Sequence, residues 1–340
     1  MALNYARRLQ NLQNRRFDPT IQKSILSESF SKLELPEDLK YLAESMMPIG
    51  NTYNEKTITA ANNVKAHLDR DLQTGLSRAY RYQGSVMTNT NIKTYSDIDL
   101  LTIIDSYYYP EVHDPNNVYS GDADSDINQL RKDCVKILES KYDEVDSTGS
   151  KSISIYNKNL KRKVDIIICY WYQSEKYKET QDEYYKGVFL YDFDLKKRIK
   201  KDYPFAHIRQ VDIKGNATND GFRRGVRLLK NLKADSEDRI TLSSFQLTSI
   251  VFSMSDAGLQ FSAGYELSIA ENISSHLNKL ISEPTYRFNV KSPTGIEYPL
   301  KDESVSEQLK ELKKDLDQLI IDCKSDLRNN YFEKSLRNYL

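Results

Sequence analysis

The 340-residue sequence predicts an α+β protein, in which a unit built on a small mixed sheet precedes a mostly helical half. Apolar residues recur at helix-compatible intervals over residues 55–80, and short apolar runs typical of strands follow. After Tyr172 the apolar spacing becomes mostly helical. We therefore expect three parts: an N-terminal helical segment over 1–54, a sheet-bearing lobe over 55–180 and a helical lobe over 181–340.

The elements of the sheet-bearing lobe follow from local patterns. Residues 55–80 predict one long helix, 81–87 a turn, and "DIDLLTII" a strand followed by a long loop over 105–120. The acidic first turn of "DADSDINQLRKDCVKILESKY" favours a helix, because carboxylates stabilise the positive end of the helix dipole. "KSISIY" and "LKRKVDIIICYWY" predict two strands joined by a turn at Asn157, Lys158 and Asn159.

The helical lobe has three segments with clear helical periodicity, "GFRRGVRLLKNLKA", "TLSSFQLTSIVFSMS" and "GYELSIAENISSHLNKLIS". A last helix over 305–327 has heptad-like apolar spacing, which is compatible with a coiled coil. We expect it instead to pack on the core of its own chain.

Composition restricts the classes of function. Lysine plus arginine (49) equals aspartate plus glutamate (49), which argues against a protein that coats nucleic acid, and no stable nucleic-acid complex is expected. No stretch approaches the length of a membrane span, and the N-terminal residues lack the apolar core of a signal peptide. The three cysteines show no metal-ligand spacing. Because an odd and sparse cysteine count suits a reducing compartment, we expect a cytoplasmic protein.

Three aspartates predict a cation site. Asp97 and Asp99 alternate along a strand, so their carboxylates point the same way and repel unless a cation or proton lies between them. Asp165 interrupts an otherwise apolar strand, where a lone carboxylate is costly unless it is paired or metal-bound. Carboxylate oxygens suit Mg²⁺, with Mn²⁺ as an alternative, and the turn at Gly84 and Ser85 can hold phosphate oxygens. A solvated pair of carboxylates is the alternative interpretation.

This constellation resembles the nucleotidyltransferase fold of the DNA polymerase β superfamily. The stretch from Gly84-Ser85 through Thr90 to the Asp pair looks like the bacterial CD-NTases, which are relatives of cyclic GMP-AMP synthase and oligoadenylate synthetase. Members of that family often have Gly-Thr where this chain has Asn89-Thr90. "GVFLYDF", "YPFAHI" and "NATNDGFRRGVRLLKNLK" follow in the order of segments that the family shows.

The resemblance implies a cleft between the two lobes that binds nucleoside triphosphates. Asp97 and Asp99 would hold the metal ions, and Asp165 would also help to deprotonate the acceptor hydroxyl. Lys230 would contact the donor triphosphate together with Ser244, or with Ser243 if the register differs by one. Arg223, Arg227 and Lys230 otherwise form a basic stripe that by itself indicates a solvated helix face.

The implied activity is Mg²⁺-dependent synthesis of a cyclic di- or oligonucleotide second messenger, with release of pyrophosphate. In this family the product activates a downstream effector in bacterial antiphage (CBASS) signalling. A nucleotidyltransferase acting on an RNA end or on a protein is one alternative. A nucleotide sensor without catalytic activity is another, although all three carboxylates are present.

Overall fold

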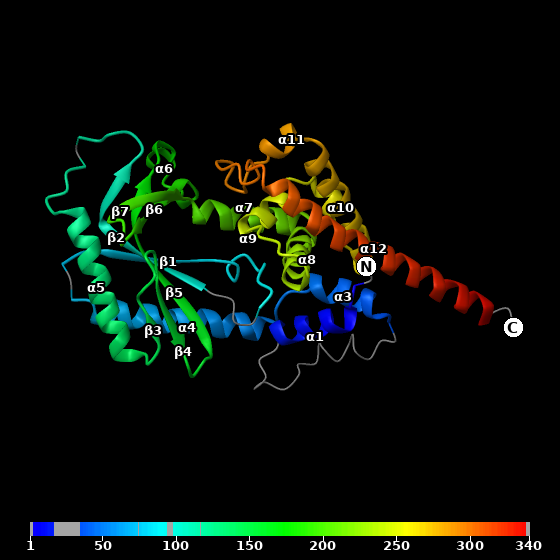
Figure 1. The fold of residues 1–340 in the computed structure, drawn as a ribbon. Helices are drawn as coiled ribbons and strands as arrows, with labels where there is room; N and C mark the ends of the chain where they lie inside the picture. Colours follow the sequence, from blue (N-terminus) through cyan, green and yellow to red (C-terminus); the bar gives the residue numbers. More distant parts are fainter. Residues whose placement is uncertain (1–2, 17–34, 74, 94–97, 116, 338–340) are drawn as a thin grey trace. The chain divides into compact units, whose positions relative to one another are not determined.

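The computed structural model describes residues 3–16, 35–73, 75–93, 98–115 and 117–337, and it separates into two compact units (Figure 1). Residues 49–91 and 95–210 form the first, here called the sheet unit. Residues 1–48, 92–94 and 211–340 form the second, here called the helical unit. The N-terminal helices therefore belong to the same unit as the C-terminal helices, whereas the sequence predicted a separate segment over 1–54.

The sheet unit is built on a seven-stranded sheet with the order β1-β2-β5-β4-β3, to which β6 and β7 are added beside β5. Strands β2 and β5 run parallel, and all the remaining pairs of neighbouring strands are antiparallel. The first half of β5 pairs with β4 and the second half with β6, so one edge of this long strand serves two partners. The strands are β1 (Arg78–Gln83), β2 (Ile98–Pro110), β3 (Val145–Asp146), β4 (Ile153–Asn157), β5 (Arg162–Gln173), β6 (Lys186–Asp192) and β7 (Lys197–Asp202).

Helices α4 (Asn51–Asp71) and α5 (Ala123–Lys141) pack on one face of this sheet (Figure 1). The alternation of a strand places Leu100 of β2 and Ile166 of β5 in the core beneath these helices. The carboxylate of Asp122 caps α5 by accepting from the backbone N–H groups of Asp124 and Ser125, as the acidic first turn predicted. The short helices α6 (Glu175–Thr180) and η1 (Glu183–Tyr185) complete the unit.

Three predictions for the sheet unit were wrong in extent. The helix expected over 55–80 ends at Asp71, and residues 78–83 form β1, because Tyr80 and Tyr82 alternate toward the core with Arg81 on the other face. The expected loop over 105–120 begins as the continuation of β2 as far as Pro110. Strands β6 and β7 pair onto the sheet, so the unit that the sequence ended at residue 180 continues to Gln210.

The helical unit buries one extended apolar core shared by its long helices. Leu309, Leu312, Leu316 and Leu319 of α12 are fully buried, which confirms that this helix packs on its own chain. In the described part of the chain, no helix has both the length and the apolar character that crossing a membrane requires. The helices are α1 (Tyr5–Arg16), α3 (Glu37–Met46), α7 (Pro204–Ala217, which starts in the sheet unit), α8 (Gly221–Asp235), α9 (Ser244–Phe252), η2 (Asp256–Leu259), α10 (Glu266–Ser282), α11 (Pro284–Phe288) and α12 (Val305–Arg337).

Candidate active site

A row of polar residues crosses the sheet on the face opposite α4 and α5. Gln83 of β1 is the register partner of Asp99 of β2, which is in turn the partner of Asp165 of β5. Ser154 of β4 is paired with Asp165 from the other side. Paired residues on neighbouring strands lie roughly 5 Å apart. The two carboxylates predicted to share a site therefore share one cross-strand row.

Each described carboxylate of this row accepts a hydrogen bond from a neighbouring strand. The amide of Gln83 donates to Oδ2 of Asp99 at 3.0 Å, and the hydroxyl of Ser154 donates to Oδ1 of Asp165. The ammonium of Lys163 lies 3.0 Å from Oδ2 of Asp165, whose side chain is 15% exposed. These contacts offset part of the repulsion between the two adjacent carboxylates. Sequence reasoning missed Gln83, Ser154 and Lys163.

Asp97, the first aspartate of the predicted pair, lies outside the described residues. Within the described ranges, no cluster of three or more histidine, cysteine or acidic side chains could hold a metal ion. Asp99 and Asp165 supply two carboxylates on neighbouring strands. Asp97 comes two positions before Asp99 in the sequence, which is the spacing of side chains on one face of a strand. Mg²⁺ takes one or two protein carboxylates and completes its octahedron with water and phosphate oxygens, so the residues present fit this ion.

The turn at Gly84 and Ser85 follows strand β1, whereas the sequence predicted that it would follow a helix. Gly84 has a φ of +105°, which favours glycine, and the carbonyl of Ser85 accepts from the backbone N–H of Thr90 at 3.0 Å. Asn89 also adopts a left-handed conformation, with φ +53°. Asparagine tolerates this region better than other non-glycine residues, which explains how it stands where relatives of the family often have glycine.

The predicted basic stripe on α8 is buried and its two arginines are ion-paired, so a solvated helix face is the wrong interpretation. The guanidinium of Arg227 is fully buried, donates to Asp220 at 2.6 Å and donates to the backbone carbonyl of Met46 at 2.7 Å. Arg223 lies 2.9 Å from Asp212. Lys230 is 7% exposed, and burial, followed by the nearby charge of Arg227, lowers its pKa to about 7.

Ser243 and Ser244 have different structural roles at the start of α9. Ser243 is the N-cap: its hydroxyl accepts from the backbone N–H of Gln246, and the Gln246 side chain accepts in return from the Ser243 N–H. Ser244 is exposed, and its hydroxyl makes no hydrogen bond that is found within the described part of the chain. Of the two alternatives, Ser244 is the one with a hydroxyl that is not used for capping.

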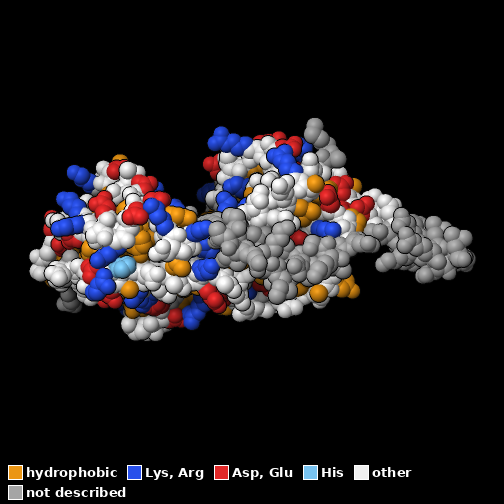
Figure 2. Space-filling model, turned by 90° about the horizontal axis from the view of Figure 1, so that it is seen from below, with side chains coloured by type: hydrophobic (Ala, Val, Ile, Leu, Met, Phe, Trp, Pro, Cys, Tyr) orange, Lys and Arg blue, Asp and Glu red, His pale blue; other side chains and the backbone are white. Residues whose placement is uncertain are grey.

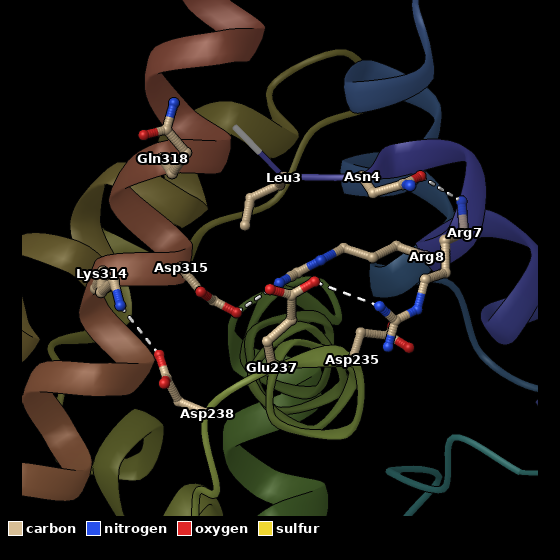
Figure 3. A pocket seen from close by; sticks show the side chains of 10 residues that line it. All are labelled: Leu3, Asn4, Arg7, Arg8, Asp235, Glu237, Asp238, Lys314, Asp315 and Gln318. Carbon is tan, nitrogen blue, oxygen red and sulfur yellow. Dashed lines mark hydrogen bonds and ion pairs between the residues drawn. The ribbon is translucent and has the colours of Figure 1, made fainter. Parts of the chain in front are cut away.

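A pocket of about 290 Å³ in the helical unit contains none of the predicted site residues (Figure 3). Its charged lining is already paired: Arg8 with Asp315 at 2.6 Å, Arg7 with Glu237 at 3.3 Å, and Lys314 with Asp238 at 3.0 Å. Acidic side chains outnumber basic ones in this lining, which does not suit a triphosphate.

On the face drawn in Figure 2, basic and acidic side chains are interspersed, as the balanced composition implies.

Comparison with known proteins gives close relatives, although no family model matches the chain. A c-di-GMP synthase from Capnocytophaga granulosa is 32% identical in an alignment that covers 91% of this chain and 96% of the relative. A c-di-GMP synthase from a Lachnospiraceae bacterium is 32% identical over 282 residues, covering 74% and 80%. The solved structure of the STING-associated CdnE c-di-GMP synthase from C. granulosa covers 95% of this chain and 99% of its own, with a TM-score of 0.82.

Proposed function

Because this chain belongs to the CD-NTases, the family of nucleotidyltransferases that make cyclic dinucleotides, we propose that it condenses two molecules of GTP into c-di-GMP. That it is a cyclic nucleotide synthase follows from its membership. The choice of GTP is supported by the names of the two relatives that are 32% identical. The observation that carries the assignment of the site is the register pairing of Asp99 with Asp165.

Asp97, Asp99 and Asp165 are proposed as the carboxylates that hold Mg²⁺, or Mn²⁺ in its place. The bound ion supplies activation of the attacking hydroxyl and neutralises charge on the leaving pyrophosphate. Gln83 and Ser154 fix the orientation of Asp99 and Asp165 through the hydrogen bonds described above. Because Asp99 and Asp165 each accept a hydrogen bond from a neighbouring strand, these two carboxylates need little reorganisation when charge develops during the reaction.

Each condensation forms one bond and breaks one. A ribose hydroxyl of the acceptor attacks the α-phosphorus of the donor, and the bond between that phosphorus and the bridging oxygen of the β-phosphate breaks. Pyrophosphate leaves with the bond's electron pair, and the proton of the hydroxyl passes to Asp165 or to water. A second condensation of the same kind closes the ring, so two pyrophosphates are released for each cyclic dinucleotide.

Gly84, Ser85, Lys230 and Ser244 are proposed as nucleotide contacts on the strength of the family resemblance. Backbone N–H groups and a serine hydroxyl in a turn such as that at Gly84 and Ser85, where Gly84 has a positive φ, are suited to phosphate oxygens. Lys230 offers an ammonium and Ser244 a hydroxyl that does not cap α9. Lysine and serine are ordinary partners of phosphate groups.

We place the activity in bacterial antiphage (CBASS) signalling, in which the product acts on a downstream effector. One relative is described as STING-associated, which supports an effector that recognises a cyclic dinucleotide. The substrates and the three buried free cysteines suit the cytoplasm. Transfer to an RNA end or to a protein, and a sensor without catalysis, have no counterpart among the relatives described above.

The test is incubation of the purified protein with GTP and Mg²⁺, alone and with the other three ribonucleoside triphosphates. Products are treated with phosphatase and identified by mass spectrometry, beside a variant carrying Asp97→Asn and Asp99→Asn. We expect phosphatase-resistant c-di-GMP from GTP alone and none from the variant. Product from the variant at the wild-type rate would falsify the proposed site, and a cyclic product lacking guanine would overturn the choice of substrate.

A further inference from the structure

Lys163 lies two residues before Asp165 on strand β5, so both side chains are on the same face of the sheet. Its ammonium is 3.0 Å from Oδ2 of Asp165, and Ser154 donates to Oδ1 of the same carboxylate. One oxygen of the third proposed metal ligand is therefore held by a neutral donor and the other by a cation. A metal ion that binds through Oδ2 competes with this ammonium for the same oxygen.

A second carboxylate lies within reach of the Lys163 charge. Asp146 of β3 is the register partner of Ser154, so the polar row extends from Asp165 through Ser154 to Asp146. Hydrogen bonds from the Thr148 hydroxyl and backbone N–H, followed by the nearby charge of Lys163, hold the pKa of Asp146 below its usual range. Within the described residues, the ammonium of Lys163 therefore contacts Asp165, a proposed metal ligand, and its charge also acts on Asp146, which is not one.

We propose that Lys163 is the resident counter-cation of Asp165, that metal binding displaces it, and that Asp146 accepts the displaced ammonium. This proposal rests on the proposed function, because it takes Asp165 as a metal ligand. In it Lys163 is a positioning residue: it holds the carboxylate in place and sets how much metal is needed to occupy the site.

The strength of the contact suits such an exchange. The side chain of Lys163 is 42% exposed and that of Asp165 is 15% exposed, so the pair is screened by water on the lysine side. Ion pairs of this kind contribute at most about 1 kcal/mol, which corresponds to a change of roughly 3- to 5-fold in the affinity of a competing cation. A fully buried pair would block the metal, and this one only raises the concentration that is required.

The first measurement is binding of Mn²⁺ to the 340-residue chain without nucleotide, detected as loss of the free-ion signal in electron paramagnetic resonance. Lys163→Met keeps the aliphatic stem and removes the charge, and we expect it to tighten Mn²⁺ binding about 3- to 5-fold. Lys163→Arg keeps the charge and should restore affinity to near the wild-type value. Asp165→Asn gives the baseline for loss of the site. Unchanged affinity in Lys163→Met, with loss in Asp165→Asn, overturns the proposal.

The role of Asp146 is tested by a double-mutant cycle. Asp146→Asn should weaken Mn²⁺ binding about 2-fold while Lys163 is present, because the displaced ammonium loses its second partner. In the Lys163→Met background the same change should have little effect. An equal effect in both backgrounds assigns Asp146 a direct, long-range attraction for the metal and overturns its role as acceptor.

The same variants separate this proposal from the proposed function. Both proposals are supported if Lys163→Met lowers the Mn²⁺ concentration that gives half-maximal c-di-GMP synthesis and changes kcat by a smaller factor than it changes this concentration. If c-di-GMP forms normally but the affinity for Mn²⁺ is the same in the wild-type protein and in Lys163→Met, only the counter-cation proposal fails. If no nucleotide mixture yields a cyclic product, the proposed function fails, whatever the binding data show.

Discussion

At the scale of single residues, the proposed contact between the buried Lys230 and the nucleotide would couple binding to pH. Burial lowers its pKa to about 7, with the charge of Arg227 acting in the same direction. A triphosphate in contact with this ammonium favours the charged form and raises the pKa again. Binding at a pH above 7 must then take up a proton, and affinity must fall as the pH rises from 7 toward 9.

We therefore predict proton uptake when GTP binds at pH 8. Calorimetric titrations in two buffers of different ionisation enthalpy measure the number of protons directly. We expect most of one proton to be taken up per Lys230 in the wild-type protein and none at this site in Lys230→Met. Lys233→Met is the matched control, because Lys233 lies one turn further on and donates to the backbone carbonyl of Leu242. Equal proton uptake in wild type and Lys230→Met would remove Lys230 from the nucleotide site.

Whether the contacts of a residue could be predicted depends on how far away in the sequence its partners are. Alternation predicted that Asp97 and Asp99 share a face, and Asp165 was singled out because it interrupts an apolar strand; the structure pairs Asp99 with Asp165 in register. The turn predicted at Asn157, Lys158 and Asn159 would pair residue 156 with residue 160 and put Ser154 opposite Arg162. The structure instead pairs Asn157 with Arg162, which puts Ser154 opposite Asp165, so this partner depended on the exact length of the turn. The environment of Arg227 could not be predicted either, because its backbone partner is the carbonyl of Met46, which is remote in sequence.

At the scale of elements, two of the strands that the sequence analysis missed, β1 and β7, have mixed polar patterns. Strand β7 is exposed and strongly basic over Lys197–Lys200, so it lacks the apolar alternation of a half-buried strand. It lies at the end of the sheet, where β6 is its one partner among the described strands. Basic side chains on such an edge discourage pairing with another chain, which gives this composition a structural reason that apolar periodicity does not detect.

The start of α9 gives a prediction that separates capping from binding. Ser243→Ala removes the N-cap hydroxyl and should lower the free energy of unfolding by about 1 kcal/mol. Ser244→Ala removes an exposed hydroxyl that does not cap the helix, so its effect on stability should be below about 0.5 kcal/mol.

Denaturant unfolding measures the stability of both serine variants, and steady-state kinetics measures KM for GTP. If Ser244 contacts the nucleotide as proposed, Ser244→Ala raises KM while Ser243→Ala changes it little. A rise in KM confined to Ser243→Ala would shift the proposed contact by one residue and would mean that the cap hydroxyl is exchanged for phosphate. Unchanged KM in both variants would remove this turn from the nucleotide site.

At the scale of the whole molecule, the chain joins distant segments in each unit. The N-terminal helices α1 and α3 pack in the helical unit with α8 and α12, whereas local patterns suggested an independent segment over 1–54. Hydrophobic periodicity identifies which face of a helix is buried but not which other helix covers it. The partners here are specified by buried polar contacts, such as Tyr41 with Asp235 at 2.9 Å and Arg15 with Asp235 at 2.6 Å.

Substitution of the adjacent residues Arg7 and Arg8 of α1 measures how strongly this helix is bound to the rest of the helical unit. The guanidinium of Arg8 pairs with Asp315 of α12 at 2.6 Å, and the two side chains are 4% and 8% exposed. Arg7 pairs with Glu237 at 3.3 Å, with exposures of 60% and 64% (Figure 3). Removing one partner of a buried pair leaves an uncompensated buried charge, whereas an exposed pair is replaced by water at little cost.

We therefore predict that Arg8→Met lowers the free energy of unfolding by about 3 kcal/mol or more, and that Arg7→Met changes it by less than about 1 kcal/mol. Chemical denaturation followed by circular dichroism measures both. The double variant Arg8→Met, Asp315→Leu removes the stranded carboxylate and should recover much of the loss, since the cost arises from the unpaired charge and not from the missing attraction. If Arg8→Met and Arg7→Met destabilise equally, the buried pair adds nothing to the contact between α1 and α12, which is then held by apolar packing and by the hydrogen bond from Tyr5 to Asp322.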